Sequence, residues 1–189
     1  LSLAQTDPDP PALNYPMTST LLRTHAYRDG KPFLSVGETL SQKMVGDLLY
    51  EVYYIVPGFP FSIRDPSNTI VNGIRLVNIY DFKANTKRGV YFLISTENEE
   101  NCMSDTTVKM EEPRITFTGN TTIRGLDTMG FRYQYKEYAE DIFYTEDVHG
   151  WVNFRTIHIF PETHDESQWL LDAGTHFKLA LDDKFFDTT

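Results

Sequence analysis

Aromatic and polar residues alternate along the segment from Phe131 to Phe160. Every second residue from 131 to 135 is aromatic, and the residues between them are long and polar. A turn at His149-Gly150 is followed by a second alternating run over residues 151–160. A period of two is typical of a β-strand whose two faces differ. Because both faces carry bulky groups, we expect these strands to separate a packed layer from a second apolar or mixed surface.

Turn residues divide most of the chain at near-hairpin spacing. Pro57-Gly58, the stretch 65–68 and the acidic stretch 97–100 are typical turn sequences. Strands are expected over residues 70–82, 89–96, 106–110, 114–118, 121–125, 131–138, 142–145, 151–160 and 176–181. This arrangement predicts a mostly β, single-domain fold: a strongly curved antiparallel sheet or barrel with one or two short helices and an apolar pocket.

Two segments are expected to be helical. Apolar residues between 38 and 52 fall at helical spacing, with Thr39 as the N-cap, although Tyr53–Val56 favours the competing interpretation of a strand over 48–56. Residues 167–173 are the second helical candidate. The proline-rich residues 1–20 are expected to form an extended segment, and residues 21–189 a single β-rich ligand-binding domain.

Charge excludes two classes of partner. Acidic residues outnumber basic ones 27 to 17, which gives a formal net charge of −10. Nucleic acids and anionic membranes favour clustered Lys and Arg, so neither is an expected partner. Apolar runs such as residues 53–56 are far shorter than the ~20 residues of a membrane span, so no span is expected either.

Two features favour a secreted protein. The chain begins with Leu1 rather than Met, as a processed protein would. Asn120-Thr121-Thr122 is an N-glycosylation sequon between two expected strands, where a surface turn belongs. Cys102 is the single cysteine, and we interpret it as a buried small hydrophobe or, in a secreted protein, as one half of an intermolecular bridge. Few cysteines would otherwise favour an intracellular protein.

No motif predicts a catalytic or metal site. His158 and His164 lie close together in the sequence, next to Asp165 and Glu166, but the spacing does not enforce the convergence that zinc requires. The acidic residues, such as Glu140, are interpreted as solvated strand edges. The stretch 98–105 could bind calcium, although it lacks the spacing of an EF-hand loop.

The aromatic residues are the strongest remaining signal, with 13 Phe, 11 Tyr and 2 Trp. In an ordinary β-protein they would fill the core. On the concave face of a curved sheet they would instead hold an apolar ligand, oriented by a few polar groups. The candidate lining residues are Phe92, Phe131, Tyr133, Tyr135, Trp151, Phe154 and His158.

The central segment resembles the ependymin-related proteins. The resemblance depends on residues 78–82, on Lys87-Arg88 after a polar hairpin, on the strand 89–95 and on Cys102, and it continues loosely to Phe160. It implies a secreted, glycosylated and often dimeric protein, with a fold similar to the bacterial lipoprotein carriers. It also implies a hydrophobic cargo such as a lipid or a carotenoid, and calcium binding has been attached to the family. That family normally has several cysteines in disulfides, whereas this chain has one.

These observations favour a non-enzymatic carrier of an apolar small molecule. One alternative is a β-sheet interaction module that forms a homo- or heterodimer. The other is a β-barrel hydrolase or isomerase that uses His158 or His164. Lipocalins share the architecture, but their Gly-x-Trp signature is missing.

Overall fold

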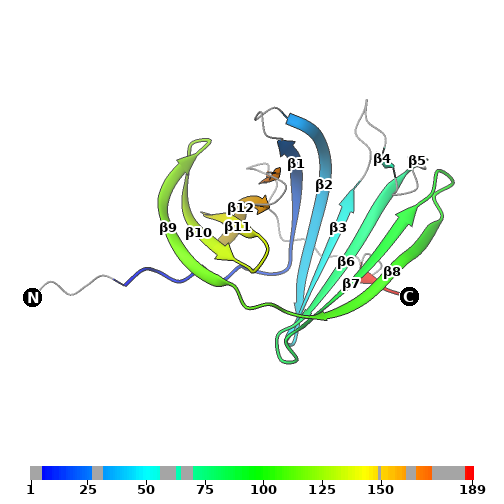
Figure 1. Ribbon diagram of the computed structural model, residues 1–189, viewed down its shortest axis with the longest axis horizontal. Coiled ribbons are helices and arrows are strands. Elements are labelled where there is room, and N and C mark those ends of the chain that lie inside the picture. The colour runs from blue at the N-terminus through cyan, green and yellow to red at the C-terminus, as the bar shows by residue number, and fades with distance from the viewer. Residues whose placement is uncertain are drawn as a thin grey trace, which may run out of the picture.

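The computed structural model describes residues 6–26, 32–55, 63–64, 70–148, 150–160, 165–171 and 186–189. These residues are almost all in β-strands (Figure 1). The strands are β1 (Met17–Ala26), β2 (Pro32–Val45), β3 (Leu48–Ile55), β4 (Ile63–Arg64), β5 (Ile70–Val71), β6 (Gly73–Asp81), β7 (Thr86–Ile94), β8 (Glu100–Lys109), β9 (Arg114–Ile123), β10 (Leu126–Gln134), β11 (Ala139–Asp147), β12 (Gly150–Phe160) and β13 (Asp165–Leu171).

Eleven of the strands form one sheet, in the order β8-β7-β6-β3-β2-β1-β13-β12-β11-β10-β9. Every neighbouring pair is antiparallel. In Figure 1 the sheet is a strongly curved wall, with β9 to β12 facing β6 to β8 across an open side. The predicted mostly β, curved antiparallel fold is therefore confirmed.

Neither predicted helix forms within the described residues. Residues 38–52 lie in the β2–β3 hairpin, whose turn begins at Gly46 with a φ of 61°, the conformation that glycine supplies in tight hairpin turns. The apolar spacing was helical, but each strand finds a partner on both sides, and tyrosine and β-branched residues favour that environment. Residues 167–171 belong to β13, and residues 172–173 lie outside the described part.

Two other boundaries differ from the expectations. β1 begins at Met17, so residues 17–20 belong to the sheet rather than to an extended segment. The expected strands at 114–118 and 121–125 are one strand, β9. Arg124 and Gly125 form the two-residue turn that follows, with φ values of 49° and 78°. The strand expected over 176–181 lies outside the described residues.

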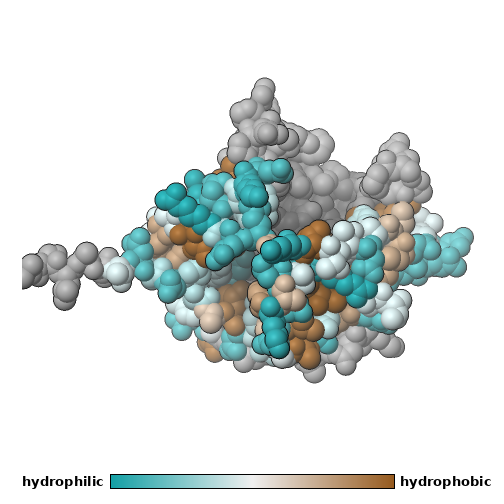
Figure 2. Space-filling model, turned by 60° about the horizontal axis from the view of Figure 1, so that its bottom comes forward, coloured by the Kyte–Doolittle hydropathy of each residue, from teal (hydrophilic) through white to brown (hydrophobic). Residues whose placement is uncertain are grey.

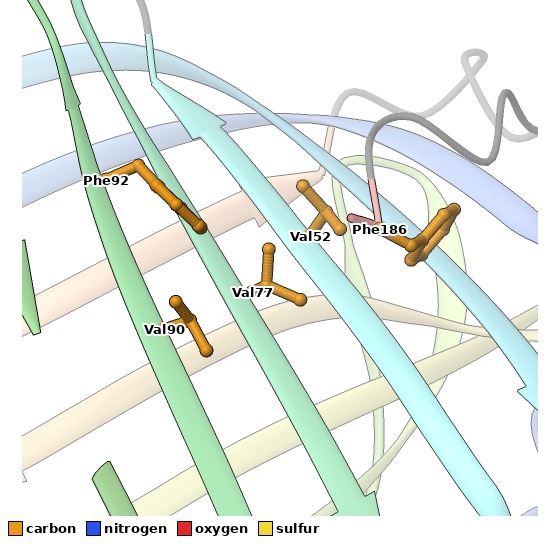
Figure 3. Close-up of a cluster of buried hydrophobic side chains, with 5 residues drawn as sticks. All are labelled: Val52, Val77, Val90, Phe92 and Phe186. Carbon is orange, nitrogen blue, oxygen red and sulfur yellow. The ribbon is translucent and has the colours of Figure 1, made fainter. Parts of the chain in front are cut away.

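One face of β3, β6 and β7 carries a hydrophobic core (Figure 3). Its members are Val52, Val77, Val90, Phe92 and Phe186, none of them more than 6% exposed. Phe186 comes from the C-terminal segment, and its ring meets that of Tyr50 edge-on at 6.2 Å. The end of the chain therefore covers the outer face of this half of the sheet.

A second cluster, which we call the Phe154 cluster, shows how far the sheet curves. Phe154 of β12 is completely buried and packs against Leu40, Tyr53, Ile123 and Leu126. In a flat sheet β12 and β3 would be four strand spacings apart, or about 19 Å at ~4.8 Å per spacing. Contact between Phe154 and Tyr53 therefore requires the sheet to fold over itself.

We predict that Phe154→Ala lowers the free energy of unfolding by about 3–5 kcal/mol, because it leaves a cavity where the two halves of the sheet meet. Urea denaturation followed by circular dichroism measures the change. Phe82→Ala is the matched control, since Phe82 is 56% exposed and its loss should cost less than about 0.5 kcal/mol. Equal effects of the two substitutions would contradict the packing.

Candidate functional site

The other face of β3, β6 and β7 forms the inside of the curve and carries polar groups. The register aligns Glu51 with Asn78, Leu49 with Tyr80, and Tyr80 with Lys87, so these residues share one face. On the opposite half, Glu140 of β11 aligns with Tyr133 of β10. We call Glu51, Tyr80, Lys87 and Glu140 the inner polar cluster.

Glu51 is held by two neighbours on the inner face. Gln42 of β2 donates a hydrogen bond from Nε2 to the Glu51 carboxylate at 2.8 Å, and the Tyr80 hydroxyl group also hydrogen-bonds it. Burial raises the pKa of Glu51, and these hydrogen bonds and the charge of Lys87 oppose the rise only in part. Gly89 faces Asn78 on the neighbouring strand, where a Cβ atom would lie 3.4 Å from Asn78 Oδ1.

Glu140 lies on the far half of the sheet and still interacts with this group. Burial raises the pKa of Glu140 to about 7, Lys87 lowers it, and Glu51 raises it further. In a flat sheet Glu51 and Glu140 would be about 24 Å apart, where salt screens most charge interactions. Curvature therefore brings two carboxylates and one lysine into a shared, poorly hydrated interior.

Tyrosines surround Glu140. The hydroxyl groups of Tyr133 and Tyr144 lie 2.8 Å apart and form a hydrogen bond. Burial is the largest cause of the raised pKa of Tyr133, Tyr135, Tyr138 and Tyr144, and the charge of Glu140 raises each of them further. Burial and the charge of Glu51 raise the pKa of Tyr15 to about 12. These phenols stay protonated and can donate hydrogen bonds at neutral pH.

Several of these side chains are desolvated and yet retain accessible surface. Tyr80, Tyr133, Glu140 and Glu51 are all half-buried. Aromatic rings, a few hydroxyl groups and buried carboxylates together form a lining that can hold an apolar molecule and orient its polar end. The arrangement lacks the pairing of a nucleophile with a base that covalent catalysis needs, as far as the described residues show.

The predicted lining residues do not all share one environment. Phe131 and Tyr133 lie together: the Phe131 ring packs on Phe117 and Tyr144, at centroid distances of 5.3 and 5.9 Å. Tyr135 stacks on Tyr138 at 4.6 Å in the β10–β11 connection. Phe154 is the centre of the Phe154 cluster.

The other predicted lining residues lie elsewhere. Phe92 is on the outer face, in the core with Val52, and the Arg75 guanidinium lies 4.2 Å from its ring centroid. The backbone of His158 pairs with Glu140 in β12 and β11. His164 lies outside the described residues.

Trp151 and Asn120 line one open pocket of about 320 Å³. Thr121, Thr122, Asp127, Thr128 and Met129 complete its wall. Thr122 donates a hydrogen bond to Asp127 at 3.2 Å, and Thr128 donates one to the carbonyl oxygen of Thr121 at 2.8 Å. Asn120 is exposed and lies within β9 rather than in a turn, so the expected turn at the sequon is wrong.

Sequence reasoning missed the inner polar cluster. Glu140 was expected at a solvated strand edge, which is wrong, because its strand lies between β10 and β12 and its side chain faces the curve. The alternation of side chains along the strands could have predicted part of this cluster, since Tyr133 and Glu140 lie on the same face of neighbouring strands. Only the curvature shows that Glu51 and Glu140 meet.

Cys102 and the proposed calcium segment also differ from expectation. Cys102 is exposed on the edge strand β8, so the interpretation as a buried hydrophobe is wrong. Most of the stretch 98–105 lies in β8. There, Glu100 pairs with Arg75, and Asp105 pairs with Arg88 at 2.6 Å. Within the described ranges, no group of three or more His, Cys, Asp or Glu is arranged to hold a metal ion.

The described part of the chain contains no helix long and apolar enough to cross a membrane.

Comparisons with known proteins identify the fold. No family model and no curated protein matches the sequence. The structure is similar to a DUF1329 family protein from Desulfovibrio piger, with a TM-score of 0.55 and 10% identity over 92% of this chain and 90% of that one. It is also similar to a candidate outer membrane lipoprotein-sorting protein domain from Vibrio parahaemolyticus, with a TM-score of 0.50 and 9% identity over 90% and 88% of the two chains.

These matches support the expected likeness to a lipoprotein-carrier fold. The narrower resemblance to the ependymin-related proteins stays a prediction.

The inner polar cluster predicts that stability falls as pH rises. The folded protein keeps a proton on Glu140 up to about pH 7, whereas the unfolded chain loses it near 4.5. The contribution of this proton to the free energy of unfolding is complete below pH 4.5 and is lost as pH rises through 7. Its upper limit is about 3 kcal/mol. The raised pKa of Glu51 acts in the same direction.

Glu140→Gln should remove most of this dependence and should make the protein more stable than the wild type at pH 8. Urea denaturation at pH 5 and pH 8 measures both effects. Glu137→Gln is the control, because Glu137 is exposed in the same connection. A Glu140→Gln variant with the pH profile of the wild type would refute the buried position of this carboxylate.

Proposed function

We propose that this chain is a secreted, non-enzymatic carrier that binds a hydrophobic small molecule, such as a lipid or a carotenoid-like molecule, against the inner face of the sheet. One observation carries the proposal: desolvated, half-buried tyrosine and glutamate side chains share the inside of the curve with aromatic rings. Burial of apolar ligand surface would drive binding at roughly 25 cal/mol per Å², before ordering costs.

The comparisons add support to this proposal. The Vibrio parahaemolyticus domain has the same fold and is named for lipoprotein sorting. A lipoprotein carries acyl chains, so a protein that sorts it has to handle apolar chains in water. A curved sheet with a half-buried inner face suits that task in the present chain too.

Secretion and glycosylation belong to the same proposal. Asn120 is exposed on the edge strand β9, where a glycan has room, and an extracellular protein would carry one there. Peptide mapping of protein from a eukaryotic secretory host tests this site. Recovery of only the unmodified Asn120 peptide would count against it.

Native mass spectrometry and solvent extraction test the carrier function. Protein from its natural source should carry a reproducible extra mass that leaves with organic solvent, and a carotenoid-like cargo should add an absorption band in the visible range. A mass explained by the chain and its glycan alone would oppose the proposal. In that case the aromatic residues would serve only as core.

The edge strands favour a second candidate function, an interaction module. β8 and β9 are the two edges of the sheet, and they expose Met103, Val108 and Ile115, which are 54%, 52% and 47% exposed. Unpaired edges can pair with another strand, and exposed Cys102 lies on one of them. On the face shown in Figure 2, however, hydrophobic areas are scattered among hydrophilic ones. Light scattering would detect a dimer, which a carrier can also form.

A substitution on the inner face should weaken cargo binding. Leu76 aligns with Tyr53 on β3 and Tyr91 on β7, and it is half-buried. Leu76→Gln places an amide against the ligand and should weaken binding of a fluorescent fatty acid about tenfold or more. Val148→Gln is the control, because Val148 is 94% exposed. Unchanged affinity in the folded Leu76→Gln protein would place the ligand elsewhere.

A further inference from the structure

Three of the six arginines whose side chains the structure describes are paired with carboxylates. Arg75 pairs with Glu100, Arg88 with Asp105 at 2.6 Å, and Arg132 with Asp141 at 2.7 Å. With 27 acidic residues against 17 basic ones, a carboxylate partner is easily supplied. A buried arginine nitrogen without any hydrogen-bond partner, in contrast, needs an explanation.

Besides the exposed Arg114, the described arginines outside these pairs are Arg155 and Arg124. Within the described residues neither forms an ion pair with a carboxylate, and the buried Nε atom of Arg155 has no hydrogen-bond partner. They lie close enough for their charges to repel, and burial followed by the charge of Arg124 lowers the pKa of Arg155. Arg124 is exposed to solvent, but the buried donor of Arg155 is costly unless an acceptor joins it.

Both arginines adjoin the Phe154 cluster. Arg155 follows Phe154 in β12, and Arg124 occupies the turn between Ile123 and Leu126, which both pack on Phe154. Four members of the cluster, Leu40, Tyr53, Ile123 and Leu126, are only partly buried. An apolar surface next to two cationic groups has the chemistry that complements an anionic amphiphile.

We propose that Arg155 and Arg124 bind the anionic head, a carboxylate or a phosphate, of an amphiphile whose apolar part lies along the Phe154 cluster. This inference rests on the proposed carrier function and narrows its cargo. The guanidinium group suits this role because its planar set of donors matches a carboxylate or a phosphate in two-bond geometry. Neutral carotenoids and alcohols would bind less tightly than fatty acids or lysophospholipids.

The test compares palmitate with the alcohol of the same chain length by isothermal titration at pH 8, using the full chain. The wild type should bind palmitate at least about tenfold more tightly than the alcohol, as charge-assisted hydrogen bonds allow. Arg155→Gln and Arg124→Gln should each reduce this preference and leave binding of the alcohol unchanged. Arg114→Gln, at an exposed position that begins β9, should preserve the preference.

Arg155→Lys separates the role of charge from that of geometry. It keeps the positive charge without the planar donors, so the preference should fall only in part. Equal binding of acid and alcohol by the wild type would overturn the inference and leave the carrier function standing. Binding of neither ligand would overturn both. Saturable binding of acetate alone would indicate a site for free anions and would contradict the proposal that the ligand is an amphiphile.

Discussion

The curvature of a single eleven-stranded sheet is the constraint on which the rest of the structure depends. Contact between Phe154 and Tyr53 draws strands together that are four positions apart in the sheet. Because the sheet folds over itself, one face becomes an interior and the other is covered by the C-terminal Phe186. The described side chains of β3, β6 and β7 are thereby all buried or half-buried, and most of those on the inner face retain some exposed surface.

Curvature also explains the raised pKa values of the carboxylates in the interior. A carboxylate raises the pKa of another only where water and salt screen poorly, and Glu51 and Glu140 come from opposite halves of the sheet. Lys87 opposes the effect of Glu51 on Glu140. Because the three residues come from separate strands, their interaction depends on tertiary structure alone. The pocket that includes Asn120 and Trp151 is more open to solvent. The protein thus offers two different environments on one sheet.

Strand alternation was sufficient to predict the fold class, because its period of two depends only on neighbouring residues. It predicted the strand of residues 151–160 well, whereas the strand expected over 131–138 begins earlier and ends at Gln134. It failed for residues 38–52, whose apolar spacing fits a helix. These residues form strands because β2 and β3 each pair with a neighbouring strand on both sides. It also grouped Phe92 with Phe154, which lie in different clusters, since phase within one strand does not reveal which face becomes the interior. Glu140 was assigned to a solvated strand edge for the same reason.

The position of β13 has a consequence for the order of assembly. This strand comes late in the chain and yet lies between β1 and β12, in the middle of the sheet. Before it is synthesised, β1 to β8 and β9 to β12 can each form local hairpins, but among the described strands none of the first group pairs with one of the second. The isolated bridge between Leu13 and Trp151 is a weaker link between the two halves. Closing long-range pairs is slow compared with forming hairpins. The two halves can therefore become one continuous sheet only after residue 171 has been synthesised.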